Sequence, residues 1–462
     1  MNRRGFLTHS CSLGVASATL STGLLQLGFA RTAAAQSATD YRALVCILLA
    51  GGNDSFNMLV PTENSQYNEY QQLRSDLALA QAELLPLPGT AGNGVSYGLH
   101  PGMSELQTLV TNGDAAMLAG TGTLLEGVDA AAIEAGTARV PLGLFSHADQ
   151  INQWQTSVAD QRIAQGWGGR IADRMLDANL ANGVSMNISL SGTNVFQSGN
   201  QVAEYSIEAG GDGAIGINAY GEDTPFGEFR TSSVDALLGV NQSNIFRNEY
   251  KRRMRGAIDA QSVFVEAMQT APEISTPFSA SRFSQSLRQI ARVISARDTL
   301  GATRQTFFIT VGGWDHHDEV IENQAQLLPQ ISQGLSEFRS ALGELDVFDR
   351  VTTFTSSDFG RTLTSNGRGS DHGWSGHHIV MGGSVNGGQI LGDYPLLAAN
   401  SPLDIGRGVY VPTTSVDQYF ADLALWFGVP ASELDQVLPN VRAFYSPESG
   451  DSPLGIMNPL VA

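Results

Sequence analysis

The pattern of apolar positions predicts buried strands that alternate with amphipathic helices. Residues 42–50 form a continuous apolar run that ends at Gly51 and Gly52, which is typical of a strand buried on both faces of a parallel sheet. Shorter runs of the same kind occupy residues 115–119, 184–190, 306–311, 351–356 and 378–381. Helical periodicity is present at 64–83, 102–112, 148–158, 168–179, 283–299, 317–344 and 415–427. This alternation predicts an α/β fold in which helices cover both faces of a mostly parallel sheet.

Two stretches interrupt this alternation. Residues 191–232 are rich in Gly, Ser and Asn, which predicts polar excursions or a small β subdomain. Residues 244–270 carry Arg247, Lys251 and three further arginines, and we expect them to form a charged surface helix. Because no repeat and no linker divides the chain, we expect residues 36–462 to form a single domain with insertions.

The first 35 residues have the features of a signal peptide. Asn2-Arg3-Arg4-Gly5-Phe6-Leu7 is a twin-arginine motif, an interrupted apolar stretch follows, and Ala33-Ala34-Ala35 offers a small-residue cleavage site. An N-terminal membrane anchor is the alternative, but the apolar stretch is short for a membrane span. We therefore expect residues 1–35 to be removed and the protein to reach a periplasmic or secreted location through the twin-arginine (Tat) pathway.

The charge of the chain argues against two classes of partner. The net charge is −19, and it becomes −22 once the three arginines of the signal segment are removed. Lys251 is the only lysine, so neither nucleic-acid binding nor a polybasic membrane patch is expected. No other run of the sequence is long and apolar enough for a stable membrane span. One cysteine, Cys46, remains after cleavage, which excludes an intramolecular disulfide.

Aspartates and histidines gather just after the predicted strands. Five of the eight histidines fall between residues 316 and 378. The candidates in this region are Asp315, His316, His317, Asp358, Asp371, His372, His377 and His378. Because the carboxyl ends of parallel strands meet at one edge of a sheet, these side chains are expected to form a metal site there. Asp54, which follows the first strand, is a further candidate ligand.

Several candidates also have a plain structural explanation. Asp54 lies in an Asn-Asp-Ser turn, a sequence that commonly caps a helix. Ser146 precedes a predicted helix, so it is either a nucleophile near the positive helix end or an ordinary N-cap. Arg361 either holds an anionic substrate oxygen or is a surface or helix-capping arginine. His316 and His317 cannot both reach one metal in regular structure, so either of them is a candidate ligand.

These motifs, in this order, resemble the exported bacterial family called domain of unknown function 1501. The resemblance rests on Gly-Gly-Asn-Asp-Ser-Phe-Asn at 51–57, Gly-Gly-Trp-Asp-His-His at 312–317, Ser-Asp-Phe-Gly-Arg at 357–361, and Asp-His-Gly at 371–373 followed by Gly382 and Gly383. It covers nearly the whole mature chain. It implies a branch of the alkaline phosphatase and sulfatase superfamily, and hence an alkaline-phosphatase-like three-layer α/β/α sandwich with a metal site at the carboxyl edge of its sheet.

The resemblance also implies roles for individual residues. One or two divalent ions, with zinc as the expected metal, would be bound by Asp54, Asp315, His317 (or His316), Asp358 and His372. Ser146 corresponds by position to the nucleophile before a helix. Phe359 is a departure, because superfamily enzymes carry a histidine directly after the aspartate that matches Asp358. A second metal would then need His147, His377 or His378 as a substitute ligand.

The leading hypothesis for function is an exported metal-dependent hydrolase of phosphate, sulfate or related esters, which acts on a small anionic substrate. The metal would polarise the ester oxygen, Ser146 or a water molecule would attack, and Arg361 would hold an anionic oxygen. The sequence lacks the Cys/Ser-x-Pro-x-Arg motif that sulfatases modify. The alternative is a catalytically degenerate secreted protein of the same fold that binds a protein partner at the cell surface. Phe359 and the acidic composition motivate that alternative.

Overall fold

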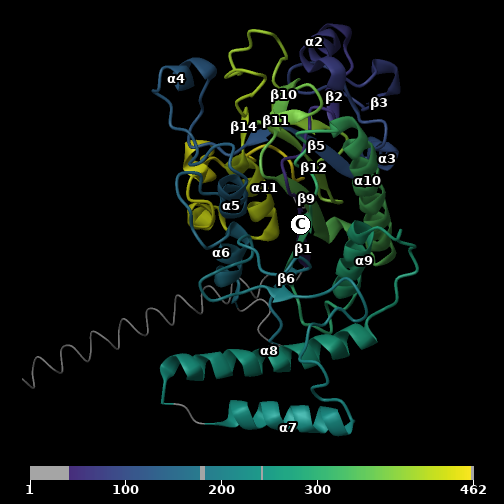
Figure 1. Ribbon diagram of the computed structural model, residues 1–462, viewed down its shortest axis with the longest axis vertical. Helices are drawn as coiled ribbons and strands as arrows, with labels where there is room; N and C mark the ends of the chain where they lie inside the picture. The colour runs from purple at the N-terminus through teal and green to yellow at the C-terminus, as the bar shows by residue number, and fades with distance from the viewer. Residues whose placement is uncertain (1–40, 177–182, 241–242, 459–462) are drawn as a thin grey trace, which may run out of the picture.

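The computed structural model describes residues 41–176, 183–240 and 243–458. Residues 1–35, for which the sequence predicts a signal peptide, lie outside the described residues. Figure 1 shows a body of strands and helices, with a pair of helices at one end, α7 (Pro225–Gly239) and α8 (Ile245–Thr270). No described helix combines the length and the apolar composition that crossing a membrane requires.

A nine-stranded sheet forms the centre of the fold. The strands lie in the order β13-β5-β12-β9-β1-β8-β6-β7, and β14 pairs with β5. Their bounds are β1 (Arg42–Leu49), β5 (Ala115–Gly122), β6 (Asn187–Ser189), β7 (Tyr205–Ser206), β8 (Arg304–Val311), β9 (Val351–Ser357), β12 (Gly376–Met381), β13 (Ile390–Leu391) and β14 (Thr414–Ser415). Among the described residues, the pairings in this sheet are parallel except those of β12, which runs antiparallel to β5 and β9. The sheet is therefore mostly parallel, as the apolar runs predicted.

β1 occupies the middle of this sheet and is buried on both faces. It is hydrogen-bonded to β8 on one side and to β9 on the other, so Val45 lies opposite both Phe307 and Thr353. Its odd-numbered residues from 43 to 49 belong to one hydrophobic core and its even-numbered residues from 44 to 48 to another. This alternation follows from the two-residue period of a strand, and it explains why the sequence of β1 is apolar at every position after the first.

Helices cover both faces of the sheet, which confirms the predicted layered α/β architecture (Figure 1). On one face the apolar side chains come from α3 (Ser104–Thr111), α9 (Arg282–Ser295) and α10 (Val320–Glu344). On the other they come from α5 (His147–Thr156), α6 (Trp167–Arg174) and α11 (Val416–Phe427). The remaining described α-helices of the body are α2 (Asn64–Arg74), α4 (Ala130–Glu134) and α12 (Leu434–Val437).

Two small sheets lie outside the central one. The first holds β2 (Leu59–Pro61), β3 (Leu85–Pro86) and β4 (Tyr97–Leu99). The second is a hairpin of β10 (Arg361–Ser365) and β11 (Ser370–His372), in which Arg361 lies opposite His372. Because β10 begins just after β9 ends, this hairpin brings His372 back to the carboxyl edge of the sheet.

Three expectations about individual elements need correction. The helix predicted at 64–83 ends at Arg74, and short 3-10 turns at 75–77 and 81–83 follow it. The excursion predicted at 191–232 contains the start of α7, because Pro225 can begin a helix although the preceding residues are turn-like. The predicted charged helix at 244–270 is α8, but only one face of its second half is at the surface, since Ile258 and Phe264 on the other face are buried while Asp259 is exposed.

Candidate metal centre at the carboxyl edge

The turn after β1 sets the geometry of this edge. Gly51 and Gly52 have φ angles of +124° and +80°, and a Cβ atom on Gly51 would lie 2.4 Å from the backbone nitrogen of Asp315. Only glycine therefore allows the turn to pack against the segment that follows β8. The backbone N–H of Gly51 donates to Oδ1 of Asp358 over 2.9 Å, which ties the end of β1 to the end of β9.

Arg361 is fully buried and holds this edge together from within. Its guanidinium donates to the carbonyl oxygens of Gly52 and Ser370 at 2.9 and 2.8 Å, and it forms an ion pair with Asp315. The sequence hypothesis put this arginine on a substrate oxygen. The structure places it among backbone carbonyl groups instead, where it fixes the orientation of the Asp315 carboxylate.

Two histidines near Asp315 have their Nδ1 atoms directed at carboxylates. Nδ1 of His147, the first residue of α5, lies 2.6 Å from Oδ2 of Asp358. Nδ1 of His317 lies 3.2 Å from Oδ1 of Asp371. A carboxylate only accepts, so each Nδ1 donates its proton, and the neutral imidazole then carries its lone pair on Nε2. Asp358, expected as a metal ligand, is thus placed behind a histidine, where it orients the ring.

His372 has the same arrangement with a backbone group as its acceptor. Its Nδ1 atom lies 2.8 Å from the carbonyl oxygen of Phe145. Phe145 has a φ angle of +72°, a backbone conformation that is uncommon for a residue with a side chain. This local strain therefore occurs at the residue whose carbonyl group sets the tautomer of His372.

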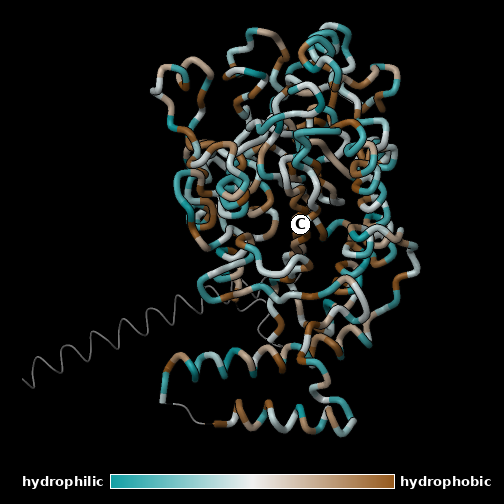
Figure 2. Tube along the Cα trace, in the orientation of Figure 1, coloured by the Kyte–Doolittle hydropathy of each residue, from teal (hydrophilic) through white to brown (hydrophobic). Residues whose placement is uncertain are grey.

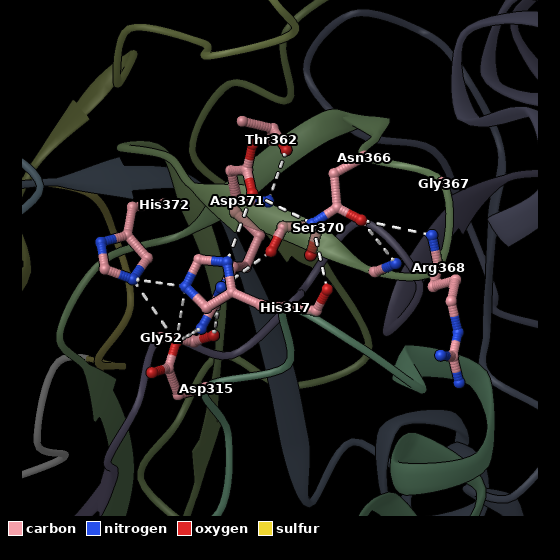
Figure 3. Close-up of polar contacts among 12 residues, drawn as sticks. Gly52, Asp315, His317, Thr362, Asn366, Gly367, Arg368, Ser370, Asp371 and His372 are labelled. Atoms are coloured by element: carbon pink, nitrogen blue, oxygen red, sulfur yellow. Dashed lines mark hydrogen bonds and ion pairs between the residues drawn. The ribbon is translucent and has the colours of Figure 1, made fainter.

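The Nε2 atoms of these three histidines converge on the carboxylate of Asp315, and Figure 3 shows two of them, His317 and His372, beside it. Those two Nε2 atoms lie 3.2 and 3.4 Å from Oδ1 of Asp315 and 2.9 Å from each other. Nε2 of His147 lies 3.5 Å from the other oxygen, Oδ2. Ligand atoms around a tetrahedral Zn²⁺ ion are about 3.3 Å apart, given metal–ligand distances of about 2.0–2.1 Å.

Three of these four side chains form a group of donor atoms that fits a divalent metal. Ligand atoms of His147, Asp315 and His372 lie within 4.8 Å of one another. Lone pairs at such distances repel one another unless a cation lies between them, and imidazole with carboxylate is a common zinc donor set. The side chain of Asp315 is 49% exposed, so the cluster is open to solvent on one side.

The charges around the cluster favour the metal-binding protonation states. Burial lowers the pKa of His372, which keeps its ring neutral near pH 7. Desolvation acts to raise the pKa of Asp315, but the hydrogen bond and the charge of Arg361 outweigh it and lower that pKa. The hydrogen bond from Asn366 lowers the pKa of Asp371. Both carboxyl groups are therefore ionised at neutral pH.

Ser146 is the N-cap of α5. Its Oγ atom accepts from the backbone N–H of Asp149 over 3.5 Å, which places His147 at the first helical position. In the described part of the chain, no serine or threonine hydroxyl is hydrogen-bonded to any of the four converging side chains. The structure supports a capping role for Ser146, and its role as a nucleophile stays a prediction.

Phe359 packs against the cluster from one side. Its ring centroid lies 4.9 Å from that of His147 and 4.5 Å from that of His372, and its side chain is buried. A phenyl ring supplies apolar contact but no lone pair. His147, one of the expected substitutes for the absent histidine, contributes an imidazole to the cluster from α5.

The structure does not bring Asp54 into the converging set. Its carboxylate is fully buried, forms an ion pair with Arg74 and accepts a hydrogen bond of 2.5 Å from Oγ of Ser370. Arg74 neutralises the carboxylate inside the protein, which gives Asp54 a structural position. The sequence pattern does not show this, because Arg74 lies at the end of a different element.

The other expected substitutes are buried away from the cluster. His377 stacks on Tyr394 with centroids 4.3 Å apart, and His378 packs on Trp154 at 4.6 Å. His316 is also buried, so His317 is the member of the adjacent pair that joins the cluster. Side chains of adjacent residues point in different directions. This explains why only one histidine of the first pair joins the cluster, and why the two histidines of the second pair contact different aromatic rings.

Two residues contribute in ways that the sequence did not predict. Asp371 was a candidate for the metal site, yet it contacts Nδ1 of His317, which comes from another segment, and orients that ring. Phe145 acts through its backbone carbonyl group. Every residue type has such a group, so the sequence gives no sign of this contact.

Comparisons with known proteins add similarities of fold and of sequence. Solved structures similar to this chain include Ps i-CgsB, at 9% identity, covering 88% of this chain and 77% of that one with a TM-score of 0.34. The lipoteichoic acid synthase LtaP from Listeria monocytogenes matches at 8% identity, with coverages of 81% and 77% and a TM-score of 0.30. A 2-O GAG sulfatase matches at 8% identity, with coverages of 75% and 65% and a TM-score of 0.26. No curated protein matches the chain in sequence.

A family model matches the part of the chain that holds most of the cluster. Asp315, His317, Asp358 and His372 lie inside the matched region, whereas His147 lies outside it. The resemblance predicted from the motifs is confirmed: residues 240–438 match the family described as "Protein of unknown function (DUF1501)".

Proposed function

We propose that this chain is an exported, metal-dependent hydrolase of phosphate, sulfate or related esters. The observation that carries the proposal is that three Nε2 atoms converge on Asp315 while an oxygen atom holds each Nδ1 proton. Oxygen partners of this kind fix the tautomer and orientation of metal-binding histidines. Two imidazoles and one carboxylate, with the imidazole of His317 beside them, suit zinc better than magnesium or calcium, which prefer oxygen ligands.

The residues of the chain prepare the site for a small anionic ester. A divalent cation held here would polarise an ester oxygen and lower the pKa of a nearby water. Asp358 and Asp371 hold two imidazoles in the metal-binding tautomer, and Arg361 holds the Asp315 carboxylate in place. Because Ser146 is engaged as a helix cap, we favour a water molecule as the nucleophile.

Metal content tests the first part of the proposal. The mature chain, residues 36–462, is purified with zinc available, and its metal is measured by elemental analysis alongside Asp315→Ala and His372→Ala. His100→Gln is the matched control, because His100 is a buried histidine outside the cluster. We expect bound metal in the wild type and the control, and its loss in the two cluster variants while circular dichroism shows a retained fold. A folded wild type that binds no metal would overturn the proposal.

Turnover tests the second part. The metal-loaded protein is assayed on phosphate monoesters, phosphate diesters and sulfate esters, and we expect hydrolysis of at least one class that disappears in His372→Ala. A protein that binds metal but hydrolyses none of them would favour the second candidate function, a secreted binding protein with a partner at the cell surface. The capping role of Ser146 and the ring of Phe359 beside the cluster are the observations that favour that candidate.

Export through the twin-arginine pathway is part of the same proposal. It rests on the motif Arg3-Arg4-Gly5-Phe6-Leu7 and on the alanines at 33–35. Replacing both arginines by lysine is expected to leave the full chain in the cytoplasm, as cell fractionation and immunoblotting would show. Unchanged export of this variant would contradict the twin-arginine assignment, although it would leave the metal centre untouched.

A further inference from the structure

Two helices form an arm that stands away from the body of the protein. The arm consists of residues 225–240, which include α7, and residues 245–257 of α8. Figure 1 shows α7 as the outermost element, with α8 between it and the body. No residue of α8 before Ile258 is buried, and in α7 only Gly227 is. The arm is therefore a two-helix unit that has solvent on most sides.

Much of the solvent-facing surface of the arm is apolar. Seven of the eleven exposed large hydrophobic side chains among the described residues lie on it. In α7 and just after it these are Phe226, Phe229, Leu237 and Val240, which are 54, 67, 72 and 50% exposed. At the start of α8 they are Ile245, Phe246 and Tyr250, which are 75, 81 and 63% exposed. Figure 2 shows the resulting mixture of hydrophobic and hydrophilic segments along both helices.

The exposed apolar area has the size of a protein interface. With about 150–250 Å² available per large side chain, the seven exposed fractions together correspond to roughly 800 Å², of which the four positions at 226–240 supply about half and the start of α8 the rest. A standard protein–protein interface buries about 800 Å² on each partner. Exposed apolar patches of this size on a soluble protein mark interaction sites.

The apolar positions of α7 are symmetric about Ser233. Phe229 and Leu237 each lie four residues from it, and Phe226 and Val240 each lie seven residues from it. The four positions inside α7, namely 226, 229, 233 and 237, therefore lie on one stripe of the helix, and Val240 follows the helix as its extended C-cap residue. When two such helices cross antiparallel at Ser233, Phe229 of one meets Leu237 of the other, and Phe226 meets Val240. The small serine at the centre lets the two backbones approach.

The two ends of the arm carry opposite charges. The start of α7 and the residues just before it are acidic, with Glu222, Asp223 and Glu228 against Arg230. The start of α8, at the opposite end of the arm, is basic, with Arg247, Lys251 and three further arginines in residues 247–255. Two of those arginines pair with Glu249 and the third pairs with Asp235 of α7, which leaves the region with a net positive charge. In an antiparallel pair, the basic end of each arm lies beside the acidic end of the other, which gives electrostatic complementarity between two identical surfaces.

We propose that the arm pairs with the arm of a second copy of this chain and forms a two-fold symmetric dimer through α7. Such an isologous contact uses the same patch on both copies and closes without leaving a free surface. It also leaves the metal cluster accessible, because the arm contains none of the cluster residues.

The mass of the mature protein in solution tests this proposal. Light scattering after size exclusion is applied to the wild type and to the double variant Phe229→Glu with Leu237→Glu. Leu396→Glu is the matched control, because Leu396 is 54% exposed and lies outside the arm. We expect a dimer for the wild type and the control, and a monomer with an unchanged melting temperature for the double variant.

A cysteine at the centre of the stripe tests the register. Cys46 is buried, so Ser233→Cys adds one accessible thiol to the mature chain. We expect mild oxidation to produce a covalent dimer of Ser233→Cys, whereas Ala257→Cys, which is exposed on α8, should remain uncoupled. A wild type that is monomeric at all concentrations would overturn the proposal. A monomer that sediments with phosphatidylglycerol vesicles would also overturn it, by assigning the arm to a lipid surface.

Discussion

Arg74 and Asp54 form an ion pair in which both side chains are completely excluded from solvent. The guanidinium of Arg74 also donates to Oδ1 of Asn57 at 2.9 Å and to the carbonyl oxygen of Thr362 at 3.0 Å. The pair therefore links the end of α2 to the turn after β1 and to β10. Removing one partner would leave an uncompensated charge in the interior, which is far more costly than removing an exposed ion pair.

The first prediction follows from this pair. Arg74→Met is expected to lower the free energy of unfolding by about 3–5 kcal/mol, because Asp54 is left buried and unpaired. Urea denaturation followed by circular dichroism measures the change. Asp54→Asn should be less stable than the wild type but should keep its metal. Loss of metal from Asp54→Asn without a loss of stability would show that Asp54 is a ligand, as the family pattern implied.

The second prediction concerns Asp358. Asp358→Asn removes the charged acceptor behind His147 while keeping the shape of the side chain, so it should weaken metal binding by about 10–100-fold without abolishing it. Competition with a chromophoric chelator gives the affinity, and Asp259→Asn, an exposed position on α8, serves as the control. If Asp358→Asn lost metal as completely as Asp315→Ala, Asp358 would be a direct ligand.

The third prediction separates backbone strain from a steric clash. Gly51 and Gly113 both have positive φ angles, but a Cβ on Gly113 would meet nothing within 4 Å, whereas on Gly51 it would press on Asp315. Gly113→Ala should therefore cost about 1 kcal/mol of stability and leave metal binding intact. Gly51→Ala should cost more and also reduce metal content, because Asp315 must move. Equal behaviour of the two variants in melting and metal assays would contradict the role given to this turn.

The fourth prediction is a pH dependence of stability. His377 and His378 are fully buried, and burial lowers the pKa of each to about 3. The native state keeps both rings neutral, whereas the unfolded chain takes up protons below about pH 6.5. The stabilisation is present above pH 6.5 and is lost as the pH falls toward 3, at about 1.4 kcal/mol per pH unit for each histidine.

His378→Gln tests this dependence directly. Its unfolding free energy, measured in urea between pH 6 and pH 4, should fall less steeply than that of the wild type by about 1.4 kcal/mol per pH unit. The slope is the readout, because the substitution also changes packing against Trp154 at every pH. Parallel curves for the two proteins would rule out His378 as a source of the acid sensitivity.

The sequence predicted the centre of the fold well, because the strands buried on both faces are apolar at nearly every position. β1 is the clearest case, since each of its residues after Arg42 is buried. The same logic found Asp315 and His372, which follow strand or hairpin ends. Parallel strands bring such positions to one edge of the sheet, whatever the conformation of the connecting loops.

The parts that were not predicted depend on contacts between distant segments. The partners of Asp54 and Arg361 could not be predicted, because Arg74 and the carbonyl groups of Gly51 and Gly52 meet them only in three dimensions. His147 was expected only as a substitute, since nothing in the sequence tells where the start of α5 lies over the sheet. The exposure of α7 could not be foreseen either, because its composition alone does not show which face lacks a neighbour.

The position of β1 has a consequence for the order in which the chain can fold. Its hydrogen-bonding neighbours, β8 and β9, begin only at Arg304 and Val351. β1 therefore has no strand to pair with until most of the chain has been synthesised. Contacts so distant in sequence slow folding and leave an apolar segment open to aggregation meanwhile. Assembly of the candidate metal-binding residues is expected to come later still, because the last of them, His372, lies beyond both strands.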